Sequence, residues 1–116
     1  MNIEELREFC MGLPAVTEDI KWSEHLVFSV AKKIFCLAGL EPPLQVAIKV
    51  PEDQFDELIQ QGEIVQASHF ARRQWVTVLD ESHFNKAGWE KYIRQSYQLV
   101  VAKLPKKTRE SIGSGH

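Results

Sequence analysis

The sequence predicts an α+β domain in which helices pack on a largely antiparallel sheet of about five strands. Segments with helical spacing stand at both ends of the chain and near its middle, and short alternating runs fill the spaces between them. Short turns between consecutive strand-like runs favour hairpins, and hairpins join antiparallel strands. The expected order is α-β-β-β-(β)-α-β-α, with three or four strands before the second helix.

The first half supplies one helix and most of the strands. Ile3, Leu6 and Cys10 recur at helical spacing, Asn2 is a suitable N-cap, and the Gly-Leu-Pro sequence that follows ends this helix near residue 12. Alternation of apolar and polar residues then predicts strands. Their ranges are 16–22, 25–30, 34–40 and 44–50, and residues 31–33 turn the chain between the second and third.

The second half begins with a helix at Pro51, a favourable first position, and Gly62 ends it. A short strand and a loop are expected within residues 63–72. Residues 74–79 alternate as a strand, with Trp75 on one face. A long amphipathic helix over 85–103 follows, and Pro105 ends it.

These elements predict one domain over residues 1–109 and a flexible tail over 110–116. No apolar run approaches the roughly 20 residues needed to cross a bilayer, and the acidic start MNIEELREFC is unlike a signal peptide. Cys10 and Cys36 stand in apolar stretches without CxxC spacing, which is typical of buried reduced thiols. We therefore expect a cytoplasmic protein without membrane partners, and we favour a monomer.

Charge is distributed unevenly along the chain. The formal net charge is −2, which argues against strong nonspecific binding of nucleic acid. However, residues 1–68 carry 5 Lys/Arg and 12 Asp/Glu, whereas residues 69–109 carry 9 Lys/Arg and 3 Asp/Glu. A folded chain with this pattern is expected to have a dipolar surface, which bears on its partners rather than its fold.

Three groups of residues are candidates for binding an anion such as a phosphate. Arginine forks match phosphate oxygens, lysines neutralise them, and an indole stacks on a base. The groups are His69, Arg72, Arg73 and Trp75 before a strand; Lys103, Lys106, Lys107 and Arg109 after the last helix; and Lys32 and Lys33 at a hairpin tip. Each group also has a purely structural interpretation. The first is a solvated loop that leads into a strand whose Trp lies in the core. The second places cations at the negative end of a helix dipole, and the third is an ordinary charged hairpin turn.

Catalytic, cofactor and metal motifs are not found. The four histidines lack the i, i+4 spacing of a helical metal site, and no nucleophile elbow or phosphate-binding glycine loop occurs. We therefore expect no cofactor, no metal and no enzymatic activity. Ser96 and Tyr97 stand on the last helix, where Tyr97 falls on the buried stripe, and its hydroxyl needs a partner such as His69 or a backbone group.

The chain resembles the MmcQ/YjbR family of small bacterial proteins. The resemblance rests on SHFARRQWVTVLD and SYQLVVAKLPKK, and on the early helix ending in Leu-Pro with the strands around Val27-Phe28 and Lys33-Ile34-Phe35. It spans residues 1 to about 109. It implies a compact fold likened to bacterial frataxin (CyaY) and to type III secretion chaperones, and it implies DNA binding through two hairpin wings.

Two functional hypotheses follow for a non-enzymatic binding module. The first is weak, salt-dependent binding of DNA phosphates through the ten candidate residues above. The alternative is a protein-interaction or chaperone-like domain that uses its sheet face, or a groove against the long helix, and ignores nucleic acid.

Overall fold

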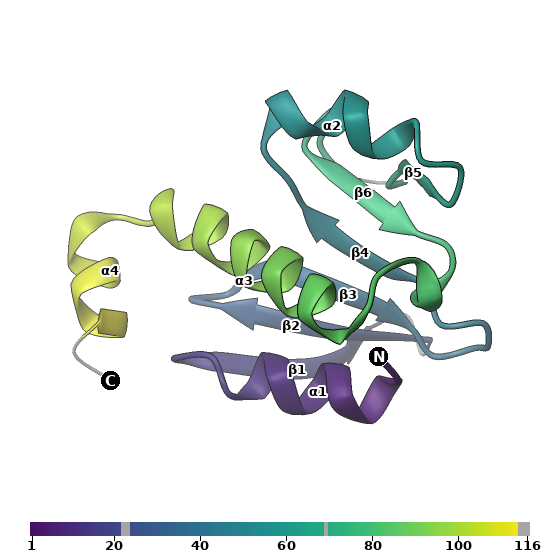
Figure 1. Ribbon diagram of the computed structural model, residues 1–116. Helices are drawn as coiled ribbons and strands as arrows, with labels where there is room; N and C mark the ends of the chain where they lie inside the picture. The colour runs from purple at the N-terminus through teal and green to yellow at the C-terminus, as the bar shows by residue number, and fades with distance from the viewer. Residues whose placement is uncertain (22–23, 69, 114–116) are drawn as a thin grey trace.

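The computed structural model describes residues 1–21, 24–68 and 70–113. Six strands form one antiparallel sheet in the order β1-β2-β3-β4-β6-β5 (Figure 1). The elements are α1 (Ile3–Met11), β1 (Val16–Lys21), β2 (His25–Val30), β3 (Lys33–Gly39), β4 (Val46–Lys49), α2 (Glu52–Ile59), β5 (Ile64–Gln66), β6 (Trp75–Val78), the 3-10 turn η1 (Glu81–His83), α3 (Lys86–Ala102) and α4 (Lys106–Gly113). The predicted α+β class and antiparallel sheet are confirmed, and the short strand considered within residues 63–72 forms as β5 ahead of β6.

Helices α1, α2 and α3 cover the same face of the sheet, and the main core lies beneath them (Figure 1). The register explains which residues reach this core, because paired residues on neighbouring strands point to the same face. The core side chains of the sheet are Leu26, Phe28, Val30, Cys36, Ala38, Val46, Ile48, Ile64, Val76 and Val78. The other face carries no helix, and we call it the open face.

The β2–β3 hairpin is tight because two residues adopt left-handed backbone angles. Ala31 has φ 49° and Lys32 has φ 66°, and paired positive φ values fit the twist of a two-residue hairpin. A bulge follows, since the register shifts between Phe28 and Ser29 and leaves Phe35 as the extra residue of β3. The carbonyl of Phe35 becomes important at the site described below.

The N-terminal ends of α1 and α3 have the caps that their sequences indicate. Asn2 and Glu5 form a reciprocal capping box at α1. Asn85 Oδ1 accepts a hydrogen bond of 2.7 Å from the Gly88 N–H at the start of α3. Trp89 then donates from Nε1 to the Glu81 carbonyl at 2.7 Å, which fixes the first turn of α3 against η1.

The C-terminal segment is more ordered than the sequence predicted. We expected a flexible tail from residue 110, but α4 extends through Gly113 and buries Ile112 to 8% exposure. Ile112 joins the main core together with Leu104, so an apolar contact fixes this short helix. Residues 114–116 of the predicted tail, and Trp22 at the end of the first predicted strand, lie outside the described residues.

The two cysteines meet inside the core. Cys10 on α1 and Cys36 on β3 are free thiols with 0% exposure. A hydrogen bond with the Cys36 thiol and then burial raise the pKa of the Cys10 thiol. The thiolate form is therefore disfavoured, as predicted for buried cysteines in an apolar setting.

Candidate nucleic-acid interface

Ser96 joins α3 to the sheet at the point where the β3 bulge interrupts pairing. Its side chain is fully buried. Its hydroxyl accepts a hydrogen bond of 2.8 Å from the Lys49 N–H and donates one of 2.5 Å to the Phe35 carbonyl. One hydroxyl thus satisfies a backbone donor of β4 and a backbone acceptor of β3, both of which would otherwise be buried without a partner.

This anchor brings two lysines together. Lys103 follows Ser96 by seven residues, so both lie on the same face of α3, and Lys103 is the C-cap of that helix. Burial and then the neighbouring Lys103 ammonium lower the pKa of the half-buried Lys49 side chain. Among the described residues, neither lysine makes an ion pair of 4.0 Å or less.

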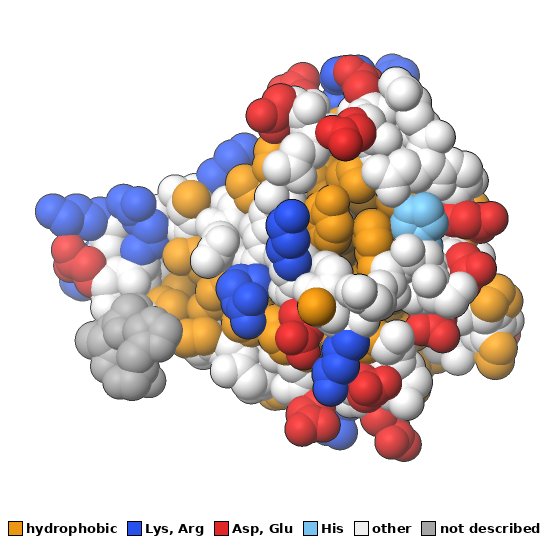
Figure 2. All heavy atoms as spheres, in the orientation of Figure 1, with side chains coloured by type: hydrophobic (Ala, Val, Ile, Leu, Met, Phe, Trp, Pro, Cys, Tyr) orange, Lys and Arg blue, Asp and Glu red, His pale blue; other side chains and the backbone are white. Residues whose placement is uncertain are grey.

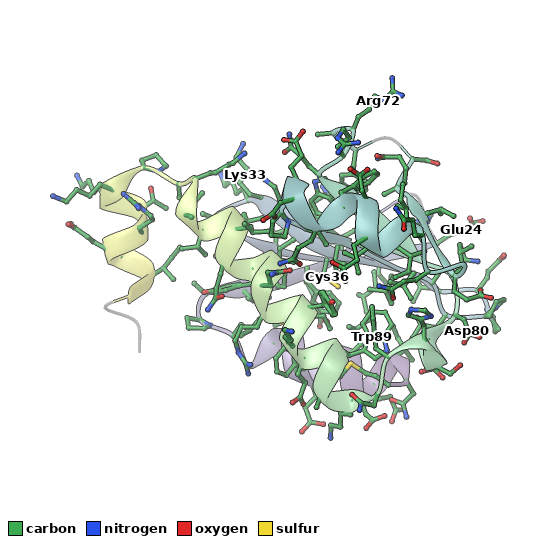
Figure 3. All side chains as sticks on the ribbon, turned by 45° about the horizontal axis from the view of Figure 1, so that its top comes forward. Glu24, Lys33, Cys36, Arg72, Asp80 and Trp89 are labelled. Carbon is green, nitrogen blue, oxygen red and sulfur yellow. The ribbon has the colours of Figure 1, made fainter. Side chains whose placement is uncertain are left out.

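Further lysines flank this pair. Lys33 begins β3, which is the strand beside β4, and its side chain lies next to the C-terminal end of α3 in Figure 3. Lys32 is exposed at the adjoining hairpin tip. Helix α4 begins immediately after α3 and adds three exposed cations, Lys106, Lys107 and Arg109.

We call this group of seven residues the basic end. Its members are Lys32, Lys33, Lys49, Lys103, Lys106, Lys107 and Arg109. Figure 2 shows Lys and Arg side chains gathered over α4 and the adjoining end of α3, with few acidic side chains among them. Six of the seven were candidates from sequence, and the fold brings them together from a hairpin, a strand start and two helices.

Arg72 and Arg73, the two arginines predicted before β6, are not part of the basic end. Arg73 is bound by two carboxylates of α2, with 2.8 Å from Nη2 to Asp56 Oδ2 and 3.5 Å from Nε to Glu52 Oε1. The hydrogen bond from Arg73 lowers the pKa of the Asp56 carboxyl. Arg72 is exposed and points outward from the molecule in Figure 3. The charge of Arg73 is thus compensated locally, which weakens it as a phosphate contact.

Trp75 adopts its structural role rather than that of a base-stacking platform. Its side chain is 7% exposed and stacks on Phe70, with ring centroids 4.2 Å apart and an interplanar angle of 20°. Both rings belong to a small second cluster on the open face. His69, the remaining candidate of this group, lies outside the described residues.

Acidic residues lie at the opposite ends of the strands. Glu24 precedes β2 and Asp80 follows β6, and Figure 3 places both on the side of the molecule away from Lys33. Hydrogen bonds from Ser82 lower the pKa of the Asp80 carboxyl. Glu24 and Asp80 therefore lie away from Lys33, and the α2 carboxylates Glu52 and Asp56 are the acidic groups that pair with Arg73.

A groove of about 840 Å³ crosses the open face. Apolar side chains form much of its surface, and Val65 on edge strand β5 is 41% exposed. It is lined by His25, Ile34, Leu37, Gly39, Gln45, Ala47, Val65, Gln66, Ala67, Ser68, Phe70, Thr77 and Leu79. Its size and mixed lining are typical of a binding surface, and it lies on a different face from the helices.

Residues 1–21, 24–68 and 70–113 contain neither a candidate metal site nor a helix able to span a membrane. That part of the chain holds no group of three or more His, Cys, Asp or Glu side chains arranged to bind a metal ion. Its helices also lack the combined length and hydropathy that a membrane span requires.

Sequence reasoning missed two residues of this site. Lys49 was assigned only to the polar side of a strand, and Ser96 was noted without a structural role. The available signal was the seven-residue spacing between Ser96 and Lys103, with a serine inside an otherwise apolar helical stripe. A buried serine needs a partner, but only the tertiary structure identifies that partner as the β3–β4 junction.

The structure is an α+β domain with a basic end and an open sheet face. The sequence profile of the YjbR family matches residues 11–99, so the chain belongs to the YjbR family. Its resemblance to that family, stated above from the motifs, is thereby confirmed.

Two solved structures share this fold. The structure of Deinococcus radiodurans protein DR2400, described as a DUF419 domain, is similar with a TM-score of 0.88 and 28% identity, covering 97% of this chain and 88% of that one. A Pseudomonas syringae protein shares the fold with a TM-score of 0.72 and 20% identity, covering 85% of this chain and 98% of its own. No curated protein matches the sequence significantly.

Proposed function

We propose that this protein is a non-catalytic module that binds duplex DNA by placing the phosphate backbone against its basic end. The observation that carries the proposal is that Lys49 of β4 lies beside Lys103 at the end of α3, and that the β2–β3 hairpin and α4, which carry the other lysines, lie on the same side of the molecule (Figure 1). Among the described residues these lysines make no ion pair of 4.0 Å or less. Lysines brought together in this way favour an anionic partner, since an anion relieves their mutual repulsion. Lys32 at the hairpin tip extends the same surface toward a duplex.

Such binding depends mainly on phosphates and therefore on salt. Each phosphate that the protein neutralises releases counterions from the DNA. It therefore adds about −0.9 to the slope of the logarithm of the binding constant against the logarithm of the salt concentration. The net charge of −2 reduces the long-range attraction. We accordingly expect weak binding that is measurable near 50 mM salt and decreases steeply toward 200 mM.

Fluorescence anisotropy with a labelled duplex tests the proposal. The triple variant Lys33→Gln, Lys49→Gln and Lys103→Gln removes the centre of the basic end. The triple variant Lys21→Gln, Lys86→Gln and Lys91→Gln changes the net charge equally at exposed positions elsewhere. We expect the first variant to lose binding and flatten the salt slope by about 2 to 3, while the second retains most binding. Equal losses in the two variants, or no binding by the natural sequence at 50 mM salt, would refute the proposal.

The groove on the open face supports a second candidate function, the binding of an extended apolar segment of a partner protein. Half-exposed side chains such as Leu37 and Val65 face this groove, and apolar surface of this kind marks interaction sites. The test is titration of immobilised apolar peptides with the natural chain and with Leu37→Gln. Loss of peptide binding in Leu37→Gln, but not in the lysine triple variant, would favour this candidate over DNA binding.

A further inference from the structure

The two outermost strands of the sheet, β1 and β5, differ in how their free edges are protected from further pairing. At β1, the Ile20 N–H donates a hydrogen bond of 2.9 Å to Asp19 Oδ1. Arg7 of α1 also binds Glu18 of this strand, with 2.6 Å from Nε to Oε2. The side chains of the chain itself thus occupy the β1 edge, which is a common protection against edge pairing.

The backbone of β5 offers hydrogen-bonding groups to an edge where no other strand of the described residues pairs. Glu63 and Ala67, which flank β5, make backbone hydrogen bonds of 2.8 and 3.1 Å to the β6 side. Alternate residues of an antiparallel strand direct their N–H and C=O groups to opposite sides. Ile64 and Gln66 therefore direct theirs away from β6, where they are positioned to pair with a further strand.

The two faces beside this edge differ in chemistry. On the open face, Val65 is 41% exposed and lines the groove. On the covered face, α2 packs against β5, and Figure 2 shows acidic side chains over this helix. Arg73 pairs with two of the α2 carboxylates. The other two, Asp53 and Glu57, are exposed and make no ion pair of 4.0 Å or less with another described residue.

We propose that β5 accepts an extended segment of a partner protein as an added antiparallel strand, and that this segment alternates apolar and basic residues. Successive side chains of a strand point to opposite faces. The apolar residues then pack beside Val65 and the adjoining groove, and the basic residues lie on the side of the α2 carboxylates. Main-chain hydrogen bonds supply the affinity, and the alternation supplies the specificity.

This inference rests on the second candidate function, since it specifies the sequence and the binding mode of the partner segment. It is independent of DNA binding. The added strand uses the β5 edge together with the Val65 side of the groove, whereas the basic end is made by other elements.

Fluorescence anisotropy with the labelled peptide KVKVKVK and the full chain tests strand addition. We expect this peptide to bind at least tenfold more tightly than KKKVVVK, which has the same composition without alternation, and than EVEVEVE. In antiparallel pairing, the peptide lysines stand opposite Ile64 and Gln66 and direct their N–H groups to β5. N-methylation of the lysine nitrogens should therefore abolish binding, whereas N-methylation of the valine nitrogens should not. Equal binding by the two methylated peptides would overturn strand addition.

Two variants identify which edge binds the peptide. Val65→Lys places a cation on β5, and Ile20→Lys places one on β1, where the natural side chain is also exposed. We expect Val65→Lys to weaken binding of KVKVKVK at least tenfold and Ile20→Lys to leave it unchanged, with circular dichroism confirming that both variants fold. Equal affinities of the two variants would overturn the assignment to β5.

The outcome with apolar peptides separates this inference from the second candidate function. Peptide binding that is lost in Leu37→Gln but is insensitive to N-methylation would leave the groove as the binding site and overturn strand addition. Absence of binding by every peptide would overturn both.

Discussion

Ser96 connects the stability of the sheet to the position of the basic end. Its hydroxyl lies between Phe35 and Lys49, next to the bulge of β3. It bridges the Lys49 N–H and the Phe35 carbonyl, which do not bond to each other directly. Tyr97, the next residue, donates to the Pro14 carbonyl at 2.7 Å and so connects α3 to the segment after α1. Adjacent residues of one helix therefore fix two different parts of the fold.

Replacing Ser96 with Ala should lower the free energy of unfolding by about 2 to 4 kcal/mol, because two buried backbone groups lose their partner. Chemical denaturation measures this loss, and hydrogen exchange at the Lys49 amide should accelerate specifically. Ser82→Ala is the control, since the Ser82 hydroxyl is in an exposed turn and bonds only to Asp80. A loss below about 1 kcal/mol for Ser96→Ala would mean that β3 and β4 close and pair directly.

Tyr97→Phe should cost about 1 kcal/mol, the typical net contribution of one hydrogen bond to a backbone carbonyl. The edge-to-face contact of its ring with Phe35, at 5.3 Å between centroids, is retained in this variant. Burial raises the pKa of the Tyr97 hydroxyl, so the protonated donor form is maintained through neutral pH. Tyr92→Phe, whose ring stacks on Phe84 at the start of α3, is the matched control. Thermal unfolding with equal midpoints for the two variants would contradict the assigned role.

The β2–β3 hairpin combines a backbone requirement with a candidate contact. Ala31 and Lys32 both have positive φ, which favours glycine or asparagine over residues with larger side chains. A lysine at such a position is unfavourable for the turn alone. Its presence at the tip is consistent with a role for its charge, as in the proposed phosphate contact.

Lys32→Gly should therefore separate stability from binding. We expect the free energy of unfolding to rise by roughly 0.5 kcal/mol, because glycine relieves the left-handed strain, while the affinity for duplex DNA falls. Lys33→Gln is the control, since it removes a neighbouring charge from extended backbone and should weaken binding without a stability gain. Denaturation curves and anisotropy on the same samples provide both quantities. Unchanged affinity in both variants would exclude the hairpin from the proposed interface.

The whole molecule has a covered face, an open face and a basic end. The covered face holds the main core, with Cys10 and Cys36 in contact at its centre. Reaching either thiol requires separation of α1 from β3. Reactivity of these thiols is therefore a measure of how the entire domain opens.

Neither cysteine should react with Ellman's reagent in the native state, because both thiols have 0% exposure and the pKa of Cys10 is raised. Addition of denaturant should increase the labelling rate in proportion to the globally unfolded fraction. A Ser82→Cys variant supplies an exposed thiol as the positive control. Labelling that is fast in buffer and independent of denaturant would show that α1 opens separately.

The sequence by itself determined the fold class, nearly all element boundaries and the asymmetry of charge. These follow from local patterns: Asn2 as a cap, alternation within the strands, and the amphipathic spacing of residues 85–103. A local pattern has no information on which elements meet. Tertiary structure alone decided that α2 carboxylates bind Arg73 and that Phe70 covers Trp75.

Long-range packing likewise decided the position of Lys49 and the formation of helix α4 near the C-terminus. The pairing of β3 with β4, and of both with Ser96, depends on contacts between residues far apart in the chain, which no spacing rule encodes. Helix α4 forms because Ile112 finds an apolar partner surface in the core. Burial supplies most helical stability in such a short segment, and burial is a property of the assembled fold.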